Sequence, residues 1–269
     1  MLGLLRHCVA ACAITASLTA AAAPVDLFPR VGDAYVVAVD GTVRWARHAD
    51  DPHQPASLAK VLTALVLLDG DWRPDAWVNV SARAAGVDGS RLGLRAGERV
   101  QAHQLLEAAL VPSANDACMA LAEHAGGGDL QTFVARMNAR AAALGMAHSH
   151  FAHPCGLDDP TQYTTPNDLL RLAQAAMRVP EFARIVALRA GRVTTDRGRR
   201  LAYRSSNALL DRYDGADGVK TGQTKLAGKC VIAHVRRQGT EVFVVLLGAP
   251  NRWWSTVILA DEALREPPR

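Results

Sequence analysis

The chain has 269 residues, of which 49% are hydrophobic and 21% charged, and its formal net charge is +4. This length is enough for one sizeable hydrophobic core or two intertwined subdomains. So mild a positive charge does not indicate a nucleic-acid partner. The sequence has no internal repeat, low-complexity segment or independent linker, so we expect no division into independent domains.

Residues 1–22 have the pattern of a secretory signal peptide. Arg6 supplies a positive charge, residues 8–20 form an apolar stretch too short to span a bilayer, and a run of alanines offers small-residue cleavage sites. We expect cleavage after Ala22, which leaves residues 23–269 as one exported domain. No later stretch is long and apolar enough to span a membrane, so we expect a periplasmic or secreted protein without a stable membrane anchor.

The exported part retains three cysteines, Cys118, Cys155 and Cys230. An odd number leaves at least one free thiol. The sequence does not show whether the other two form a disulfide.

The first predicted elements after the signal are a hairpin and a buried helix. Residues 35–39 and 42–45 are strand-like, and Asp40-Gly41 between them is a turn signal. The apolar run over residues 61–68 has no Gly or Pro until Gly70, so it predicts a helix of about three to four turns. This helix is apolar nearly all round, and such a helix is buried.

Ser57 and Lys60 lie at the start of this helix, three residues apart and therefore on one face. Burial and the positive helix N-terminus both lower the pKa of a lysine there, so that it can accept the serine proton. The backbone N–H groups of the same helix start can stabilise an oxyanion. The alternative is that Ser57 is only an N-cap residue, because Ser-x-x-Lys also occurs by chance.

The middle of the chain is mainly helical. Residues 71–102 predict loops and short strands, and helical patterns follow over residues 103–110, 116–124, 130–144, 166–177 and 181–188. Residues 230–235 and 242–247 then predict two antiparallel strands around Gly239, and residues 253–264 predict a closing helix. Strands near both ends of the chain, with helices between them, predict an α+β fold in which both ends share one sheet.

Ser113 and Asn115 fall in the break between two predicted helices, where both side chains can point into a cleft. A serine there can relay protons, and a carboxamide can both donate to and accept from a substrate amide. The alternative is that one of them merely caps the helix that begins near Asp116. The stretch Ser205-Ser206-Asn207 has the same pattern but lacks the helix–break–helix setting, so we prefer the first.

Lys220, Thr221 and Gly222 predict an edge strand that faces a cleft. Because Gly222 has no side chain to block a ligand, a peptide could add to this strand by backbone pairing. The alternative is a charged, glycine-rich turn, since Lys-Thr-Gly alone is common.

Together, Ser-x-x-Lys, Ser-x-Asn and Lys-Thr-Gly appear in the order typical of penicillin-binding proteins and serine β-lactamases. With their flanking residues, they resemble the D-alanyl-D-alanine carboxypeptidase family of low-molecular-mass penicillin-binding proteins, and the resemblance covers residues 33–262. It implies a DD-peptidase-like fold with an antiparallel sheet formed by both chain ends, flanking helices and an inserted helical subdomain.

The resemblance also implies an activity, that of a serine-type D-Ala-D-Ala peptidase acting on the stem peptides of peptidoglycan. Ser57 would attack a D-alanyl carbonyl to form an acyl-enzyme, and Lys60 would be its base. Ser113 and Lys220 would carry the proton to the leaving amine. β-Lactams such as penicillin would inhibit the protein, and no metal or cofactor would be needed.

Substrate-binding roles follow from the same resemblance. Asn115 would hold the peptide amide, and the backbone N–H groups of Ser57 and Gln223 would form the oxyanion hole. Thr221, with Arg252, would bind the terminal carboxylate.

The chain departs from many family members at its end. It stops soon after the closing helix, whereas those members continue with a β-rich domain and an amphipathic anchor. We therefore expect no C-terminal β-domain and a closer resemblance to the truncated, endopeptidase-type members. Cross-link endopeptidase activity is then expected beside removal of a terminal D-alanine.

Three other interpretations are weaker. A serine β-lactamase would need a glutamate that activates a deacylating water, and Glu181, which begins a helix, is not in a matching motif. A non-catalytic binding protein would not need all three motifs intact. The histidines at 148, 150 and 153 are closely spaced, but no second cluster completes a metal site. Separately, the arginine-rich residues 189–204 indicate a solvated surface, with attraction to an anionic wall polymer as the alternative.

Overall fold

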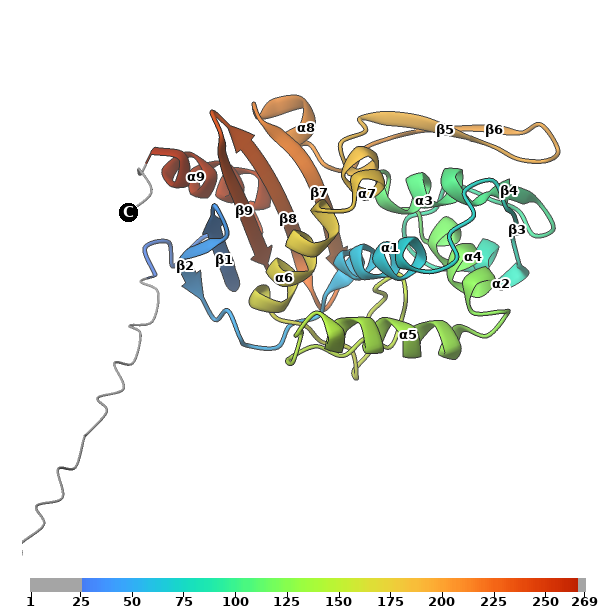
Figure 1. The fold of residues 1–269 in the computed structure, drawn as a ribbon, viewed down its shortest axis with the longest axis horizontal. Helices are drawn as coiled ribbons and strands as arrows, with labels where there is room; N and C mark the ends of the chain where they lie inside the picture. The colour runs from blue at the N-terminus through green and yellow to red at the C-terminus, as the bar shows by residue number, and fades with distance from the viewer. Residues whose placement is uncertain (1–25, 266–269) are drawn as a thin grey trace, which may run out of the picture.

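The computed structural model describes residues 26–265, so the predicted signal peptide lies outside the described residues. Its centre is a five-stranded antiparallel sheet with the strand order β2-β1-β9-β8-β7 (Figure 1). These strands are β1 (Ala34–Val39), β2 (Thr42–Arg47), β7 (Ala216–Thr224), β8 (Gly228–Arg237) and β9 (Thr240–Leu247). The prediction that both ends of the chain share one sheet is confirmed, because β1 pairs with β9.

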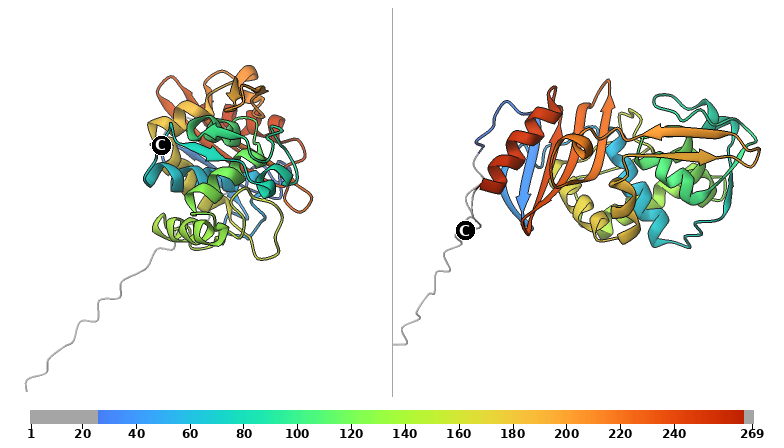
Figure 2. Two further views of the ribbon diagram at one scale, coloured as in Figure 1. Left: turned by 90° about the vertical axis from the view of Figure 1, so that its right-hand side faces the viewer. Right: turned by 90° about the horizontal axis from the view of Figure 1, so that it is seen from above.

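The sheet is buried on both faces. Along β1, Ala34, Val36 and Ala38 belong to the core that includes the helical part of the molecule, and the alternate residues face the core under α9 (Arg252–Arg265). Figure 2 shows α9 against one face of the sheet, with the helical part extending from the other. Because both faces are covered, the central strands read as continuous hydrophobic runs.

Two tight turns fix the register of the sheet. Asp40 and Gly41 join β1 to β2, and Gln238 and Gly239 join β8 to β9, with positive φ at all four residues. Two consecutive positive φ values are those of a type I′ turn, whose twist matches that of the flanking strands. The first turn was predicted from Asp40-Gly41 and the second from Gly239.

The helical part is built around α1 (Ala59–Asp69), which contacts α3, α4, α5 and α6. All residues of α1 except Val66, Leu68 and Asp69 are buried, as its pattern predicted. The surrounding helices are α3 (Ala102–Leu110), α4 (Asn115–Ala125), α5 (Leu130–Ala143), α6 (Pro166–Met177) and α7 (Pro180–Val186). Within residues 26–265, no helix combines the length and the apolarity needed to cross a bilayer.

The arginine-rich stretch forms a hairpin that the sequence did not predict. Strand β5 (Ala190–Thr194) pairs with β6 (Arg200–Arg204), and Val193 and Tyr203 are buried on one face while Arg192 is exposed on the other. The surface is therefore solvated on one face only, in the two-residue alternation of a strand. The remaining short elements are β3 (Trp77–Asn79), α2 (Ala82–Gly86), β4 (Arg99–Gln101) and α8 (Leu209–Arg212).

A buried carboxylate holds the loop before β4 against α4. Asp116 is fully buried and accepts hydrogen bonds from the backbone N–H groups of Leu92, Gly93 and Leu94, at 3.0, 2.8 and 3.0 Å. It also accepts from the N–H of Ala117 at 3.0 Å. A carboxylate that accepts several backbone hydrogen bonds is a strong local anchor.

We expect Asp116→Ala to lower the free energy of unfolding by about 3 kcal/mol, because it leaves buried N–H groups without an acceptor. Asp129→Ala is the matched control. Asp129 also accepts two backbone hydrogen bonds, as the N-cap of α5, but it is exposed, so its loss should cost about 1 kcal/mol. Urea unfolding measures both variants, and equal losses would contradict the argument from burial.

Candidate active site

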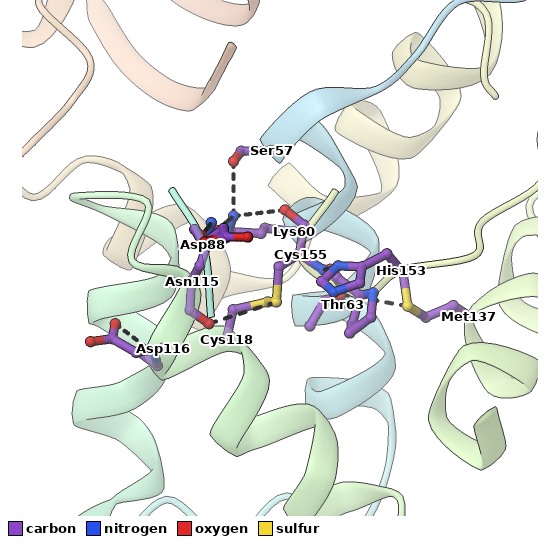
Figure 3. Close-up of a disulfide and its surroundings, with 12 residues drawn as sticks. Ser57, Lys60, Thr63, Asp88, Asn115, Asp116, Cys118, Met137, His153 and Cys155 are labelled. Atoms are coloured by element: carbon purple, nitrogen blue, oxygen red, sulfur yellow. Dashed lines mark hydrogen bonds between the residues drawn. A yellow bond between two sulfur atoms is a disulfide. The ribbon is translucent and has the colours of Figure 1, made fainter. Parts of the chain in front are cut away.

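Ser57 and Lys60 lie together where the chain leaves the sheet and enters the helical part. Ser57 is in a 3-10 turn (Ala56–Leu58) that leads directly into α1, and its side chain is partly exposed. The Nζ of Lys60 lies 2.8 Å from the Oγ of Ser57 (Figure 3). The sequence predicted an α-helical first turn here. The 3-10 turn differs only slightly, and the predicted pairing of the two side chains is confirmed.

Lys60 is 1% exposed, yet no carboxylate of residues 26–265 forms a hydrogen bond or ion pair with it. Burial, and then the positive charge of Lys220, hold the pKa of Lys60 well below its usual range. A lower pKa raises the fraction of neutral amine, which is the form that a general base needs.

The hydrogen bonds of Lys60 also fit a neutral amine. Its Nζ lies 2.7 Å from the Oδ1 of Asn115 and 2.8 Å from the backbone oxygen of Cys155. The amide nitrogen of Asn115 donates to the backbone oxygen of Asp88 at 2.6 Å, so Oδ1 must face the lysine. Both oxygens only accept, so in the neutral form of Lys60 they use the two N–H groups of the amine. The remaining lone pair is then left for the hydroxyl of Ser57.

Ser113 lies in the break between α3 and α4, as predicted. Its φ is 68°, which is unusual for a residue other than glycine and is found where surrounding structure imposes a functional geometry. The side chain is 7% exposed, and its Oγ has no hydrogen-bond partner among residues 26–265. Its predicted role in proton relay stays a prediction.

Lys220 and Thr221 lie on β7, which forms one edge of the sheet, as predicted. Lys220 is 1% exposed and donates to the backbone oxygen of Thr221 at 2.9 Å. Burial, and then the charge of Arg252, lower the pKa of Lys220 to about 7. The hydroxyl of Thr221 lies 2.7 Å from the Oγ of Ser206.

Two glycines allow two separate segments, β7 and the loop between α5 and α6, to approach the backbone N–H of Ser57 closely. A Cβ on Gly222 would lie 3.1 Å from that nitrogen and 2.9 Å from the Cβ of Ala56. A Cβ on Gly156, whose φ is 74°, would lie 1.7 Å from the backbone oxygen of Ala56. Gln223 follows Gly222 and is exposed. The contribution of its N–H to an oxyanion hole stays a prediction.

Arg252 is brought to the same strand by the start of α9. Its Nη1 donates to the backbone oxygens of Gly222 at 2.7 Å and Cys230 at 3.2 Å. Among the described residues, no carboxylate forms an ion pair with Arg252, Lys60 or Lys220. Arg252, and Lys220 when it is protonated, therefore give this side of the site a positive charge suited to a carboxylate ligand.

Sequence reasoning missed three parts of this site. The first is the backbone oxygen of Cys155, since a backbone acceptor has no sequence signature. The second is the disulfide that joins Cys118 to Cys155, while Cys230 is a buried free thiol. The third is Ser206, whose stretch was considered only as a rival to the Ser-x-Asn motif. Asn207 donates to the backbone oxygen of Gly218 on β7, so this stretch supports the third motif.

The closely spaced histidines have separate partners. The Nδ1 of His150 contacts the backbone oxygen of Thr161, and the Nδ1 of His153 accepts from the N–H of Cys155. Burial, and then the charge of Lys60, lower the pKa of His153 to about 4, so this ring is neutral. Within residues 26–265, no cluster of three or more His, Cys, Asp or Glu side chains is placed to hold a metal ion.

Comparison with known proteins identifies the family. A family model described as D-alanyl-D-alanine carboxypeptidase, peptidase S11, matches residues 32–251. The D-alanyl-D-alanine carboxypeptidase DacB2 of Mycobacterium tuberculosis is 35% identical over 229 residues, which cover 82% of this chain and 77% of the relative. DacF of Bacillus subtilis is 27% identical over 213 residues, 78% of this chain but only 54% of the relative.

Solved structures agree with this result. The D-alanyl-D-alanine carboxypeptidase from Mycobacterium tuberculosis H37Rv has a TM-score of 0.84 at 33% identity, covering 91% of this chain and 96% of that one. The Streptomyces K15 DD-transpeptidase has a TM-score of 0.83 at 26% identity, covering 91% of this chain and all of that one. The chain belongs to the D-alanyl-D-alanine carboxypeptidase family and has the DD-peptidase fold that the motifs predicted.

Proposed function

We propose that this protein is a serine-type D-Ala-D-Ala peptidase that acts on the stem peptides of peptidoglycan. The observation that carries this proposal is the contact between Ser57 and a buried Lys60 that has no carboxylate partner among the described residues. Such a lysine is favoured in its neutral form and can take the serine proton. Family membership supports the substrate class, since the named relatives are D-alanyl-D-alanine carboxypeptidases.

The reaction begins when the lone pair of Lys60 accepts the proton of Ser57. The serine oxygen attacks the D-alanyl carbonyl, and the backbone N–H groups of Ser57 and Gln223 stabilise the oxyanion. Ser113 and Lys220 carry the proton to the leaving amine, which departs to give an acyl-enzyme. Water then attacks the ester, which releases the shortened peptide and returns the proton to Ser57.

Binding of the substrate uses the edge of the sheet. A peptide lies against β7, where Gly222 leaves room for its backbone, and Asn115 is placed to contact its amide. The terminal carboxylate is bound by Thr221 together with the positive charges of Lys220 and Arg252. Lys220 has a pKa near 7 in the free protein, and a bound carboxylate raises that pKa and so keeps the lysine charged.

A serine β-lactamase is the alternative, and the carboxylates of the described residues do not favour it. Glu181 on α7 is the glutamate that was considered for this role from the sequence. It forms an ion pair with Arg184 at 2.8 Å. We therefore propose that an acyl-enzyme formed with penicillin persists, because no carboxylate within residues 26–265 forms a hydrogen bond or ion pair with Ser57 or Lys60 that would place it to activate a water.

Penicillin should label Ser57 covalently and persistently at neutral pH. Lys60→Ala should lower the rate of labelling by about 10³-fold, because the serine loses its general base. Mass spectrometry of penicillin-treated protein locates and quantifies the adduct, and Ser57→Ala is the control that should carry none. An adduct on another residue, or rapid turnover of a chromogenic cephalosporin, would overturn the assignment.

Cross-link endopeptidase activity is a second expected reaction, with the same attack on a D-alanyl carbonyl and a different leaving amine. We expect the protein to cleave both uncross-linked pentapeptides and purified cross-linked dimers. The products, identified by mass, distinguish the two activities. Loss of D-alanine from pentapeptides while the dimers stay intact would show that the protein is a carboxypeptidase only.

We also propose that the mature protein acts outside the cytoplasmic membrane, where peptidoglycan lies. The signal-like residues 1–22 support this location. Fractionation of expressing cells should find the protein in the periplasm or the medium after a salt wash. Firm retention in the membrane fraction would contradict this location.

A further inference from the structure

The disulfide joins the two segments whose oxygens accept hydrogen bonds from Lys60. Cys118 is one turn after Asn115 on α4, and Cys155 is in the loop between α5 and α6 (Figure 3). Both cysteines are fully buried. Asn115 and Cys155 supply the two oxygens that accept hydrogen bonds from Lys60. The covalent bond therefore joins the two segments that orient the amine.

Other hydrogen bonds of this loop are made to helices α1 and α5. The hydroxyl of Thr63 on α1 donates to the backbone oxygen of Pro154 at 2.6 Å. The side chain of Asn138 on α5 makes two backbone hydrogen bonds with Phe151, both at 2.8 Å. These bonds hold the loop to α1 and α5, but not to α4.

Among the described residues, the disulfide is the bond that holds the loop to α4. The Sγ of Cys155 also lies 3.8 Å from the backbone oxygen of Asn115. A disulfide sulfur carries no hydrogen, so this is a van der Waals contact that depends on the disulfide itself.

We propose that the Cys118–Cys155 disulfide positions the catalytic base. It holds Asn115 and the backbone oxygen of Cys155 on the two N–H groups of the Lys60 amine, which leaves the lone pair for Ser57 and keeps water from the amine. This inference rests on the proposed function in which Lys60 is the base. Neither cysteine contacts the reacting atoms, so both are positioning residues.

Removing the disulfide changes the hydration of Lys60 but leaves the charges around it. Those charges are Lys220 on β7, with Arg252 beside it, and Asp116 on α4, whose carboxylate is bound by four backbone N–H groups. His153 in the loop is neutral in the protein with the intact disulfide, because burial holds its pKa at about 4. Once the loop can separate from α4, water reaches the amine and stabilises its charged form, so the pKa of Lys60 rises.

The test compares rates of acylation of Ser57 by a fluorescent penicillin as a function of pH. The mature protein carries either both cysteines or the double substitution Cys118→Ala and Cys155→Ala. Because acylation needs neutral Lys60, the rate rises with pH as Lys60 loses its proton. This ascending limb of the plot of rate against pH should move to higher pH in the double variant. A shift of about one pH unit lowers the acylation rate about tenfold at pH values below this limb and leaves the rate nearly unchanged at pH values above it.

Cys230→Ala is the matched control, because it removes a buried cysteine that lies outside the disulfide. Burial raises the pKa of its thiol to about 11, so it does not titrate through the limb. This variant should keep the wild-type limb. The wild-type protein treated with a phosphine should behave as the double variant does: the phosphine gives two electrons to the disulfide, water supplies two protons for the two thiols, and the phosphine leaves as its oxide.

Each outcome decides between the proposals. An unshifted limb, or a rate lowered equally at every pH, shows that the disulfide is only structural and overturns the inference. If circular dichroism shows that the double variant is unfolded, the reduced wild-type protein decides by the same shift. If the oxidised wild-type protein is not acylated at Ser57 at any pH, the proposed function fails instead.

Discussion

The structure depends on how one buried amine is held. The Nζ of Lys60 is almost excluded from water and makes its hydrogen bonds to Ser57, to Asn115 and to a loop carbonyl. These groups come from α1 and its leading turn, from α4, and from the loop before α6. An amine in such a place is stable only if all its partners are in position, because an unpaired buried polar group costs free energy. The helical part of the molecule serves to keep them there.

The sheet supplies the other half of the site by a different means. Strand β7 reaches Ser57 because Gly222 has no side chain, and Gly156 makes a similar close approach from the loop side. The positive groups of this half, Lys220 and Arg252, have no carboxylate partner among the described residues. Like charges so close together disfavour the ionised state, so the free site is electrostatically unfavourable until an anion is bound.

The sequence predicted those parts of the site that are made by side chains in short motifs. Ser57 with Lys60, Ser113 with Asn115 and Lys220 with Gly222 were located from three short motifs, from the order of those motifs and from the family resemblance that they carry, and the hydrophobic period located most of the strands and helices around them. Arg252 was placed at the site by the family resemblance only, because nothing in the sequence shows how a short loop directs the first turn of α9. Its contact with Gly222 depends on the packing of that helix over the sheet.

What the sequence could not predict depends on tertiary contacts. Three cysteines allow three possible pairs, and only the packing of α4 against the loop selects Cys118 with Cys155. The carbonyl of Cys155 is a backbone group that every residue type has, so the sequence cannot show its role. The β5–β6 hairpin was missed because its buried residues, such as Val193 and Tyr203, are few among the arginines.

The pairing of β1 with β9 has a consequence for the order in which the molecule folds. Ala34 lies opposite Leu247, so the sheet joins residues near the two ends of the chain. Contacts of such large sequence separation form slowly, because the entropy of closing the intervening loop is lost before the strands gain their hydrogen bonds. Helices can form earlier, because their hydrogen bonds join residues that are close in the sequence. The position of β7 beside Ser57 depends instead on the same sheet. Ser57, which follows β1, and Gly222 on β7 therefore come together only after β8 and β9 have joined the sheet between them.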